Sequence, residues 1–350
     1  MTCYHPLIRA EHRWKKEIAK DGHFYPKANI FSPNNYNKIE NLQDNEEYTY
    51  TLIPCGKCIG CRLEYSRQWA NRGYLEAKKW ENNYFVTLTY NEENLPKLEE
   101  ITTSEGITYT DQGEWKGTLV PKHLTAFIKK IRQEMKRKYN QDNIRFMACG
   151  EYGEEGERPH YHIIFFNLNL PLGDLHGAKI SWNKDIYYQS KIIEKCWGKG
   201  HHVITEANWN TIAYTARYVT KKINGEIKED YYAEKGQEPE FFRVSRRPGI
   251  AKNYYDENKE KILKYNEIIV NNSNGTIATA PPNYYKRLFK EEFEKEFKEL
   301  QEKNKKIAID NGHIKDTQTS LERKEQLKLE EKRKYEKTDL LKRGYEINKL

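Results

Sequence analysis

Residues 144–167 read IRFMACGEYGEEGERPHYHIIFFN, two apolar runs joined by a turn-like segment. The runs Ile144–Tyr152 and His160–Asn167 combine β-branched and aromatic residues, as strands do. The segment between them, GEEGERP, carries glycines and a proline, which favour a turn. This stretch therefore predicts a β-hairpin with two antiparallel strands.

The second strand of this hairpin carries two histidines in a His-x-His pattern. Residues two apart in a strand face the same side, so His160 and His162 point together while Tyr161 faces the other way. Glu151 on the partner strand could place a carboxylate beside them. Two nitrogens and an oxygen in an open site suit Mg²⁺ or Mn²⁺ bound to phosphate oxygens. An isolated His-x-His pair is more often a packing feature, so this assignment depends on the residues around it.

Strand and helix signals flank the hairpin on both sides. YFVTLTY, Tyr84–Tyr90, alternates β-branched and aromatic residues and predicts a third strand. Helices are predicted over Arg62–Trp80, from Pro121 to Tyr139 and over Asn210–Ile223. The polar stretch Leu98–Val120 predicts a hairpin or an excursion. Strand, helix, hairpin and helix in this order predict an α+β fold in which helices flank an antiparallel sheet.

The third of these helices contains YTARYVTKK, with two tyrosines four residues apart. Side chains at this spacing lie about 5–6 Å apart on one helix face, so Tyr214 and Tyr218 can face one site. A free phenol has a pKa of about 10, so attack on a phosphodiester needs help from a cation-bound phosphate and a lysine. Lys221 lies on nearly the same face, whereas Lys222 is turned about 100° further round. Such pairs usually serve packing and solvent contacts, and they gain meaning here only together with the histidines.

A cysteine cluster precedes the first helix. Cys55, Cys58 and Cys61 have the C-x₂-C-x₂-C spacing of a metal site, which also agrees with a reducing compartment. Cys3 could complete a tetrahedral zinc shell by folding the N-terminal arm back, and His5 is the other candidate for the fourth ligand. Reduced thiols without metal are the alternative, and an iron–sulfur cluster shares the spacing.

The composition allows a nucleic-acid partner without requiring one. The 350 residues carry a formal net charge of +8, and aromatic residues make up 13% of the chain. Rings in a basic groove can stack on unpaired bases. Spanning a bilayer takes about 20 consecutive apolar residues, which the chain does not offer, and its start has no apolar signal region. We therefore predict a cytoplasmic protein without a membrane partner.

Three regions follow from these patterns. Residues 1–61 are polar and turn-rich and predict an irregular arm that holds the cysteine cluster, and residues 62–250 form the predicted core. Residues 251–350 are predicted to be a linker and a charged helical region, because 34 of the last 65 residues are charged. Within it, Phe289, Phe293 and Phe297 recur every four residues and predict one helical stripe.

The motifs FVTLTY, GEYG…RPHYH and YxxxYVTKK occur in this order between Pro54 and Lys222, preceded by PCGKCIGCR. The combined pattern resembles the HUH-endonuclease replication initiators, in particular those of gokushoviruses within the Microviridae. The resemblance implies an RRM- or ferredoxin-like palm as the core. It leaves the charged C-terminal region unexplained, because no motif of the family lies there.

The resemblance also implies roles for single residues. His160 and His162 would be the metal-binding histidines of the HUH motif, and Glu151 the third ligand. Tyr214 and Tyr218 would be the paired tyrosines. The lysine that follows them would be Lys221, with Lys222 as the alternative.

The implied activity is metal-dependent nicking of single-stranded origin DNA through a 5′-phosphotyrosyl link, in rolling-circle replication of a small circular phage genome. Mg²⁺ or Mn²⁺ is the implied cofactor, host helicase and polymerase are the implied partners, and the cytoplasm of the bacterial host is the implied location. A relaxase or transposase of the same superfamily would share this chemistry. A non-catalytic protein that binds single-stranded nucleic acid would share only the aromatic and basic residues, so metal-dependent nicking separates these interpretations.

Overall fold

The computed structural model describes most of the chain, and the parts it leaves out are short. They are residues 1–2, 19–23, 33–44, 98–99, 103–107, 111–116, 154–155, 181–185, 222–231, 233–236, 273–274, 317–322 and 348–350. The contacts divide the chain into two units. The first comprises Met1–Tyr65 with Lys295–Leu350, and the second comprises Ser66–Glu294.

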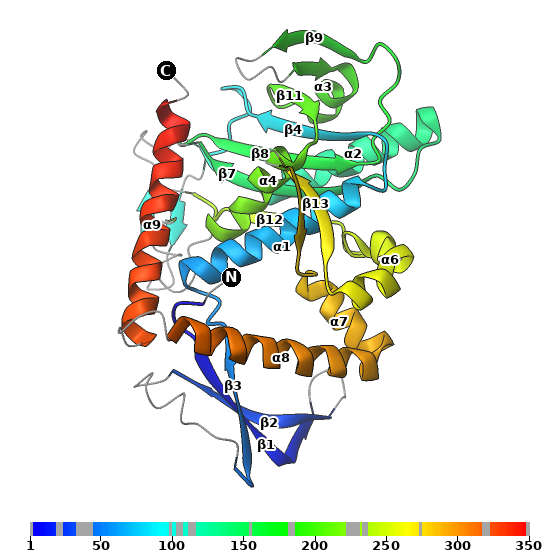
Figure 1. Ribbon diagram of the computed structural model, residues 1–350. Helices are drawn as coiled ribbons and strands as arrows, with labels where there is room; N and C mark the ends of the chain where they lie inside the picture. The colour runs from blue at the N-terminus through cyan, green and yellow to red at the C-terminus, as the bar shows by residue number, and fades with distance from the viewer. Residues whose placement is uncertain are drawn as a thin grey trace. The chain divides into compact units, whose positions relative to one another are not determined.

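The second unit is built on a seven-stranded sheet in which every neighbouring pair is antiparallel (Figure 1). The strand order is β12-β7-β8-β4-β11-β10-β9. The strands are β4 (Asn83–Thr89), β7 (Arg145–Tyr152), β8 (Pro159–Phe166), β9 (Leu175–Ile180), β10 (Ile186–Ser190), β11 (His202–Glu206) and β12 (Phe241–Val244). The predicted hairpin is confirmed as β7 and β8, and the predicted strand at Tyr84–Tyr90 is confirmed as β4.

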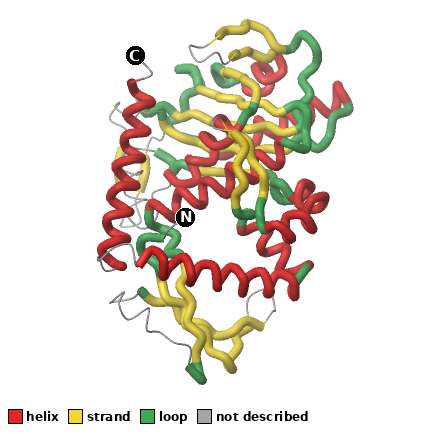
Figure 2. The backbone as a smooth tube through the Cα atoms, viewed as in Figure 1, coloured by secondary structure: helices red, strands yellow, loops and turns green. Residues whose placement is uncertain are grey.

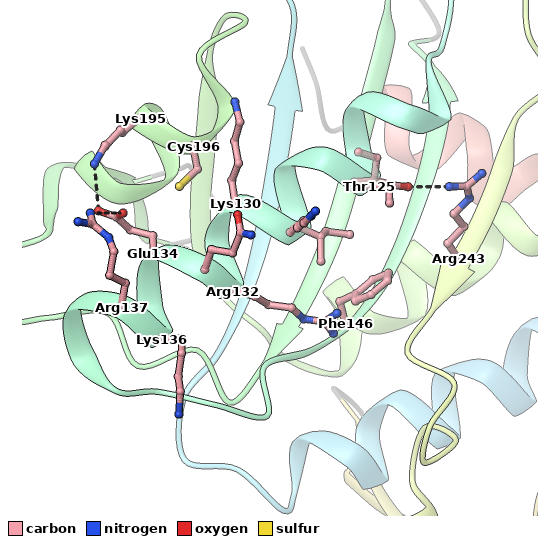
Figure 3. Close-up of a pocket in the computed structure, with 14 residues that line it drawn as sticks. Thr125, Lys130, Arg132, Glu134, Lys136, Arg137, Phe146, Lys195, Cys196 and Arg243 are labelled. Atoms are coloured by element: carbon pink, nitrogen blue, oxygen red, sulfur yellow. Dashed lines mark hydrogen bonds and ion pairs between the residues drawn. The ribbon is translucent and has the colours of Figure 1, made fainter.

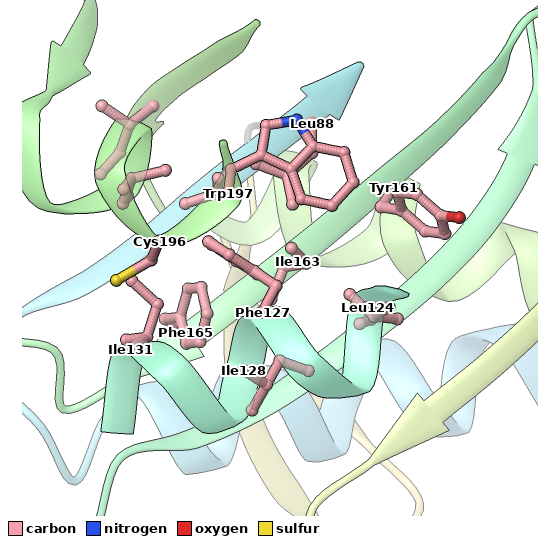
Figure 4. Close-up of a cluster of buried hydrophobic side chains, with 14 of the residues drawn as sticks. Leu88, Leu124, Phe127, Ile128, Ile131, Tyr161, Ile163, Phe165, Cys196 and Trp197 are labelled. Atoms are coloured by element: carbon pink, nitrogen blue, oxygen red, sulfur yellow. The ribbon is translucent and has the colours of Figure 1, made fainter. Parts of the chain in front are cut away.

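One face of the sheet packs against α2 (Pro121–Tyr139) and α3 (Lys191–Trp197). Leu124, Phe127 and Ile131 recur every three or four residues along α2 and are fully buried. They meet Ile163 and Phe165 of β8, and the rings of Phe127 and Phe165 lie 6.1 Å apart (Figure 4). Burying each such side chain stabilises the fold by about 1.5–3 kcal/mol. Tyr161 points into this core, as the strand periodicity predicts.

The opposite face is covered by α1 (Ile59–Ala77) and α4 (Trp209–Lys221), so helices lie on both sides of the strands (Figure 2). Gly73 of α1 permits a close approach, because a Cβ there would lie 2.6 Å from Cγ2 of Ile212 and 2.9 Å from Sδ of Met147. The α+β class, an antiparallel sheet with flanking helices, is thereby confirmed. Each of the three predicted helices is present within a few residues of its expected bounds.

The second unit continues past residue 250. It contains the two short hairpins β5–β6 and β13–β14 and the helices α6 and α7. Their bounds are β5 (Glu100–Thr102), β6 (Thr108–Thr110), α6 (Lys252–Tyr265), β13 (Ile268–Asn272), β14 (Gly275–Thr279) and α7 (Asn283–Glu292). The backbone N–H of Ala251 donates to Oε2 of the buried Glu76, and the Tyr285 hydroxyl donates to the Ala251 carbonyl over 2.8 Å. The contacts therefore divide the chain after Glu294 rather than at the expected 250/251 boundary.

The first unit holds a three-stranded antiparallel sheet of order β2-β1-β3. Its elements are β1 (Leu7–Ile18), β2 (Phe24–Phe31), β3 (Tyr48–Ile53), most of α8 (Glu294–Asp316) and α9 (Arg323–Ile347). The prediction of an irregular arm over residues 1–61 is wrong. Ile8, Ala10 and His12 are buried at alternate positions, which is the periodicity of a half-buried strand.

The predicted phenylalanine stripe is also wrong as a single helix. Helix α7 ends at Glu292 and α8 begins at Glu294, with Phe293 between them at φ −137° and ψ 53°. Phe289 packs 5.3 Å from the ring of Tyr255 in the second unit, whereas Phe297 is buried in the first. The four-residue spacing therefore crosses from one unit into the other. Among the helices of the described part of the chain, none has the length and apolarity needed to cross a bilayer.

Candidate functional site

The hairpin brings the predicted ligands to one face of the sheet. Glu151 lies directly opposite His160 in the β7–β8 register, and Cys149 lies opposite His162. Directly opposed residues in an antiparallel pair project to the same side. Glu151, His160 and His162 therefore share the face that α1 and α4 cover, and Glu151 and His162 are buried there.

His162 is held by three neighbours. Its Nε2 lies 2.5 Å from Oε1 of Glu151, and its Nδ1 lies 3.0 Å from Oγ1 of Thr87. The ring of Phe85 stacks on the imidazole at 5.4 Å and 9°. Because the carboxylate only accepts, Nε2 carries the proton here, and the Thr87 hydroxyl donates to Nδ1. Rotation of this hydroxyl would let Nδ1–H donate instead, which would free the Nε2 lone pair for a cation.

His160 already presents its outer nitrogen as an acceptor. Its Nδ1–H donates to the carbonyl of Arg158 over 2.6 Å, so Nε2 carries the lone pair of the neutral ring. Burial lowers the pKa of His160, which favours this neutral, metal-binding form. The rings of His160 and His162 lie nearly parallel, with their centroids 6.5 Å apart.

Helix α4 places a phenol on the same carboxylate. The hydroxyl of Tyr214 donates to Oε1 of Glu151 over 3.2 Å. The Tyr214 ring meets the His162 ring edge-on, at 5.2 Å and 88°. The structure thus brings together Tyr214, Glu151 and His162, whose order along the chain gives no hint of direct contact.

The remaining predicted site residues fall at the end of α4. Tyr218 and Lys221 belong to the helix, but their side chains lie outside the described part of the structure. Lys222 lies outside the described residues altogether. Tyr214 is one turn before Tyr218 on the same helix, which keeps the predicted i, i+4 relationship of their backbones.

Two further residues at the site escaped the sequence reasoning. Thr87 contacts His162 through its hydroxyl and Phe85 stacks on the same ring. Both lie on β4, whose register pairs Thr87 with His162 and Phe85 with Ile164. The alternation in FVTLTY could have placed both on one face, but only the pairing of β4 with β8 puts that face beside the histidines.

The donors at this site fit a divalent cation. His160 offers a nitrogen lone pair, Glu151 offers a carboxylate, and His162 offers a second nitrogen once its proton moves to Nδ1. Two imidazoles and one carboxylate leave coordination positions for phosphate oxygens and water.

A second candidate metal site lies in the first unit. The Sγ atoms of Cys3, Cys55, Cys58 and Cys61 all lie within 4.8 Å of one another. Burial acts to raise the pKa of Cys58, but backbone N–H groups donated by Cys61 and Tyr4 outweigh it and lower that pKa to about 7. At Cys61 burial raises the pKa. His5, the other predicted ligand, instead places Nε2 2.9 Å from the carboxylate of Glu331.

A groove of about 1060 Å³ lies along α2, on the face of the sheet away from the histidines (Figure 3). Seven of its lining residues are cationic: Lys129, Lys130, Arg132, Lys136, Arg137, Lys195 and Arg243. Glu134 neutralises part of this charge, since it pairs with Arg137 and Lys195. The groove is thus separate from the site on β7, β8 and α4.

Comparison with known proteins matches the segment that carries this site. The family model for replication-associated proteins of the ORF2 type matches residues 83–223. The chain is 35% identical over 311 residues to the replication-associated protein ORF2 of Spiroplasma virus 4, covering 88% of this chain and 87% of that protein. It is 26% identical over 270 residues to the replication-associated protein VP4 of Bdellovibrio phage phiMH2K, covering 75% and 77%. Similarity to the replication-associated protein ORF4 of Chlamydia phage 1 reaches 28% over 188 residues, covering 53% and 41%. No solved structure matches this chain.

Proposed function

The chain belongs to the family of replication-associated ORF2 proteins, and we propose that it initiates rolling-circle replication by cutting single-stranded origin DNA with a tyrosine. The observation that carries this proposal is the contact of the Tyr214 hydroxyl with the carboxylate of Glu151, beside His162. A nucleophile beside a group that can accept its proton, with metal donors on the same face, is the arrangement that this reaction needs.

The reaction forms one bond and breaks one. The Tyr214 oxygen attacks phosphorus, the bond from phosphorus to the 3′ oxygen breaks, and the DNA leaves a 5′-phosphotyrosyl link and a free 3′-hydroxyl. Oε1 of Glu151 accepts the phenol proton over the hydrogen bond that already joins the two groups. A divalent cation, Mg²⁺ or Mn²⁺, held by His160, His162 and Glu151 would supply positive charge at the phosphate oxygens.

The packing around the site keeps these groups aligned. Phe85 stacks on His162 and fixes the plane of its ring, while Thr87 holds Nδ1. Tyr214 sits on a helix that contacts both β7 and β8, so its phenol cannot move independently of the ligand strands. Positioning of this kind contributes to catalysis because the reacting groups need little further ordering.

Tyr218 is the proposed second nucleophile. After one round of synthesis, its phenol would cut the regenerated origin, and the new 3′-hydroxyl would resolve the first link and release a circle. A lysine, Lys221 or Lys222, would supply a cation near the phosphate and a proton for the departing 3′ oxygen. The released 3′-hydroxyl would prime a host polymerase, with a host helicase separating the strands, in the cytoplasm of the bacterial host.

The test uses the full-length protein and the single-stranded form of the genome that encodes it. Incubation with Mg²⁺ or Mn²⁺ is expected to give a protein–DNA adduct that survives denaturation, and chelation is expected to prevent it. His160→Ala and His162→Ala are expected to lose the adduct while retaining part of the DNA binding. His201→Ala, an exposed histidine outside the site, is the matched control. Full adduct formation by the His160→Ala, His162→Ala double variant would refute the metal assignment, and binding without any adduct would leave a non-catalytic DNA-binding protein.

A further inference from the structure

Four cysteines from both ends of the N-terminal region converge in the first unit. Cys3 precedes β1, whereas Cys55, Cys58 and Cys61 lie at the start of α1. Cys55 and Cys61 place their sulfur atoms 4.0 Å apart, and Cys3 and Cys58 place theirs 3.9 Å apart. The whole group spans no more than 4.8 Å between any two sulfurs.

These separations are those of a tetrahedral metal shell. A zinc–sulfur bond of about 2.3 Å places the sulfurs of a tetrahedron about 3.8 Å apart. A disulfide would need its sulfurs at about 2.05 Å, so the 3.9 and 4.0 Å separations are not those of bonded pairs. The four sulfurs are therefore spaced to surround one ion.

Backbone N–H groups point at the sulfurs. The N–H groups of Lys57 and Cys58 donate to Sγ of Cys55 over 3.4 and 3.3 Å. The N–H of Cys55 donates to Sγ of Cys3 over 3.3 Å, and that of Tyr4 donates to Sγ of Cys58 over 3.4 Å. The turn that directs the first two groups uses Gly56 at φ +75°, which a side chain would strain. Donors arranged in this way stabilise thiolates, the form that binds zinc.

The fourth ligand is Cys3 rather than His5. The His5 side chain is 58% exposed and its Nε2 pairs with Glu331 of α9. Among the described residues, the four thiols are the group of cysteine, histidine and acidic side chains that gathers closely enough for one ion. Four thiolates close the shell, which marks a structural site rather than a catalytic one.

The surrounding core is too small to hold this region by apolar burial alone. Its fully buried members are Tyr4, Cys58 and Leu327, and the residues packed around them are Cys3, Cys55, Ile59 and Cys61. Most of this core is sulfur, and the sheet beside it leaves Trp14 77% exposed. Small cores of this kind depend on a metal or another cross-link.

We propose that Cys3, Cys55, Cys58 and Cys61 bind one structural zinc ion that fastens the N-terminal residues to the start of α1 and supports the docking of α9. Binding displaces the remaining thiol protons, and the four Zn–S bonds replace the weak contacts between sulfurs. Leu327 packs on this cluster and Glu331 pairs with His5, so loss of the ion would also loosen α9.

Metal analysis of the full-length protein, purified without chelator, tests the proposal. One zinc per chain is expected, and Cys3→Ser and Cys55→Ser are each expected to lose it. His5→Ala, Cys196→Ala and His160→Ala are matched controls for the rejected ligand, for a buried thiol elsewhere and for the other metal site, and each is expected to retain the ion. Zinc retained by Cys3→Ser, or lost by His5→Ala, would overturn the ligand set.

A second measurement does not depend on whether the cysteine variants fold. The wild-type protein with Co²⁺ in place of zinc is expected to show the sulfur-to-metal charge transfer and the intense visible bands of tetrahedral thiolate coordination. Chelation is expected to lower the thermal unfolding midpoint of the wild type and to leave that of Cys55→Ser unchanged. Stoichiometric iron, or no metal at all, would refute the zinc site without bearing on adduct formation at Tyr214.

Discussion

Oε1 of Glu151 accepts hydrogen bonds from both the Tyr214 hydroxyl, at 3.2 Å, and Nε2 of His162, at 2.5 Å. One oxygen therefore joins the helix that carries the proposed nucleophile to the strand that carries the proposed ligands. A change in the charge around Glu151 would be felt at both partners. Binding of a cation would draw Glu151 and His162 into its shell and alter the hydrogen bond that holds the phenol.

Replacing the tyrosines tests this coupling. Tyr214→Phe or Tyr218→Phe alone is expected to leave some adduct on a short single-stranded origin but to impair the sequential cutting that releases circles. The double variant is expected to form no adduct, because both proposed nucleophiles of α4 are then gone. Tyr265→Phe, an exposed tyrosine outside the site, is the control. Mass spectrometry of the DNA-linked peptide locates the attachment, and a link outside residues 214–222 would show that the nucleophile has been misassigned.

Thr87 is expected to act as a positioning residue for His162. Thr87→Val removes the hydroxyl 3.0 Å from Nδ1, and loss of such a support typically weakens metal binding about 10–100-fold. Titration of nicking with Mn²⁺ should therefore shift to higher concentration, with a smaller change in the rate at saturation. Thr87→Ser retains the hydroxyl and should restore the titration. An unchanged titration for Thr87→Val would exclude this role.

A buried ion pair between α1 and β7 is expected to be the more sensitive of two charge pairs. Nε of Arg145 lies 2.5 Å from Oε1 of Glu76, and both side chains are buried. Glu76→Ala leaves a buried guanidinium without its partner, so we expect it to lower the free energy of unfolding by about 3–5 kcal/mol. Glu257→Ala removes an exposed pair with Lys79 and should cost at most about 1 kcal/mol. Equal effects in denaturant unfolding would contradict the importance of burial.

Stability should fall as the pH drops below about 6.5, the ordinary pKa of histidine. Burial lowers the pKa of His123, His160 and His202 in the folded state. Below about pH 6.5 the unfolded chain takes up protons that the folded chain resists, so the free energy of unfolding decreases as pH falls. At His202, protonation of Nε2 would also break the hydrogen bond donated by the N–H of Ser190 over 2.8 Å.

The thermal unfolding midpoint, measured from about pH 7.5 to about pH 5.5, checks this dependence. His202→Gln should make the decline shallower, although Glu194 and Asp174 nearby attract a proton to the ring and oppose the effect of burial. His201→Gln changes the exposed neighbouring residue and should leave the decline as it is in the wild type. A midpoint that rises as the pH falls would reverse the assigned sign.

Local periodicity made much of the sheet unit predictable from the sequence. The alternation in HYHIIFF set His160 and His162 on one face and Tyr161 on the other, and the structure places Tyr161 in the core. Period-2 and period-3.6 patterns report which side of an element is buried, and they depend only on neighbouring residues. The same reasoning failed for Phe289 and Phe297, because a regular spacing does not reveal that the two residues are buried in different units.

The sequence by itself determined the hairpin, the helices and the shared face of the two histidines. Only the tertiary structure decided that β4 pairs with β8 and brings Thr87 to His162, and that Tyr214 reaches Glu151 across 63 residues. It also decided between Cys3 and His5 by bringing Glu331 to the histidine. Contacts of this kind arise when separate elements pack to bury their apolar faces, and the distance between two residues along the chain carries no information about that packing.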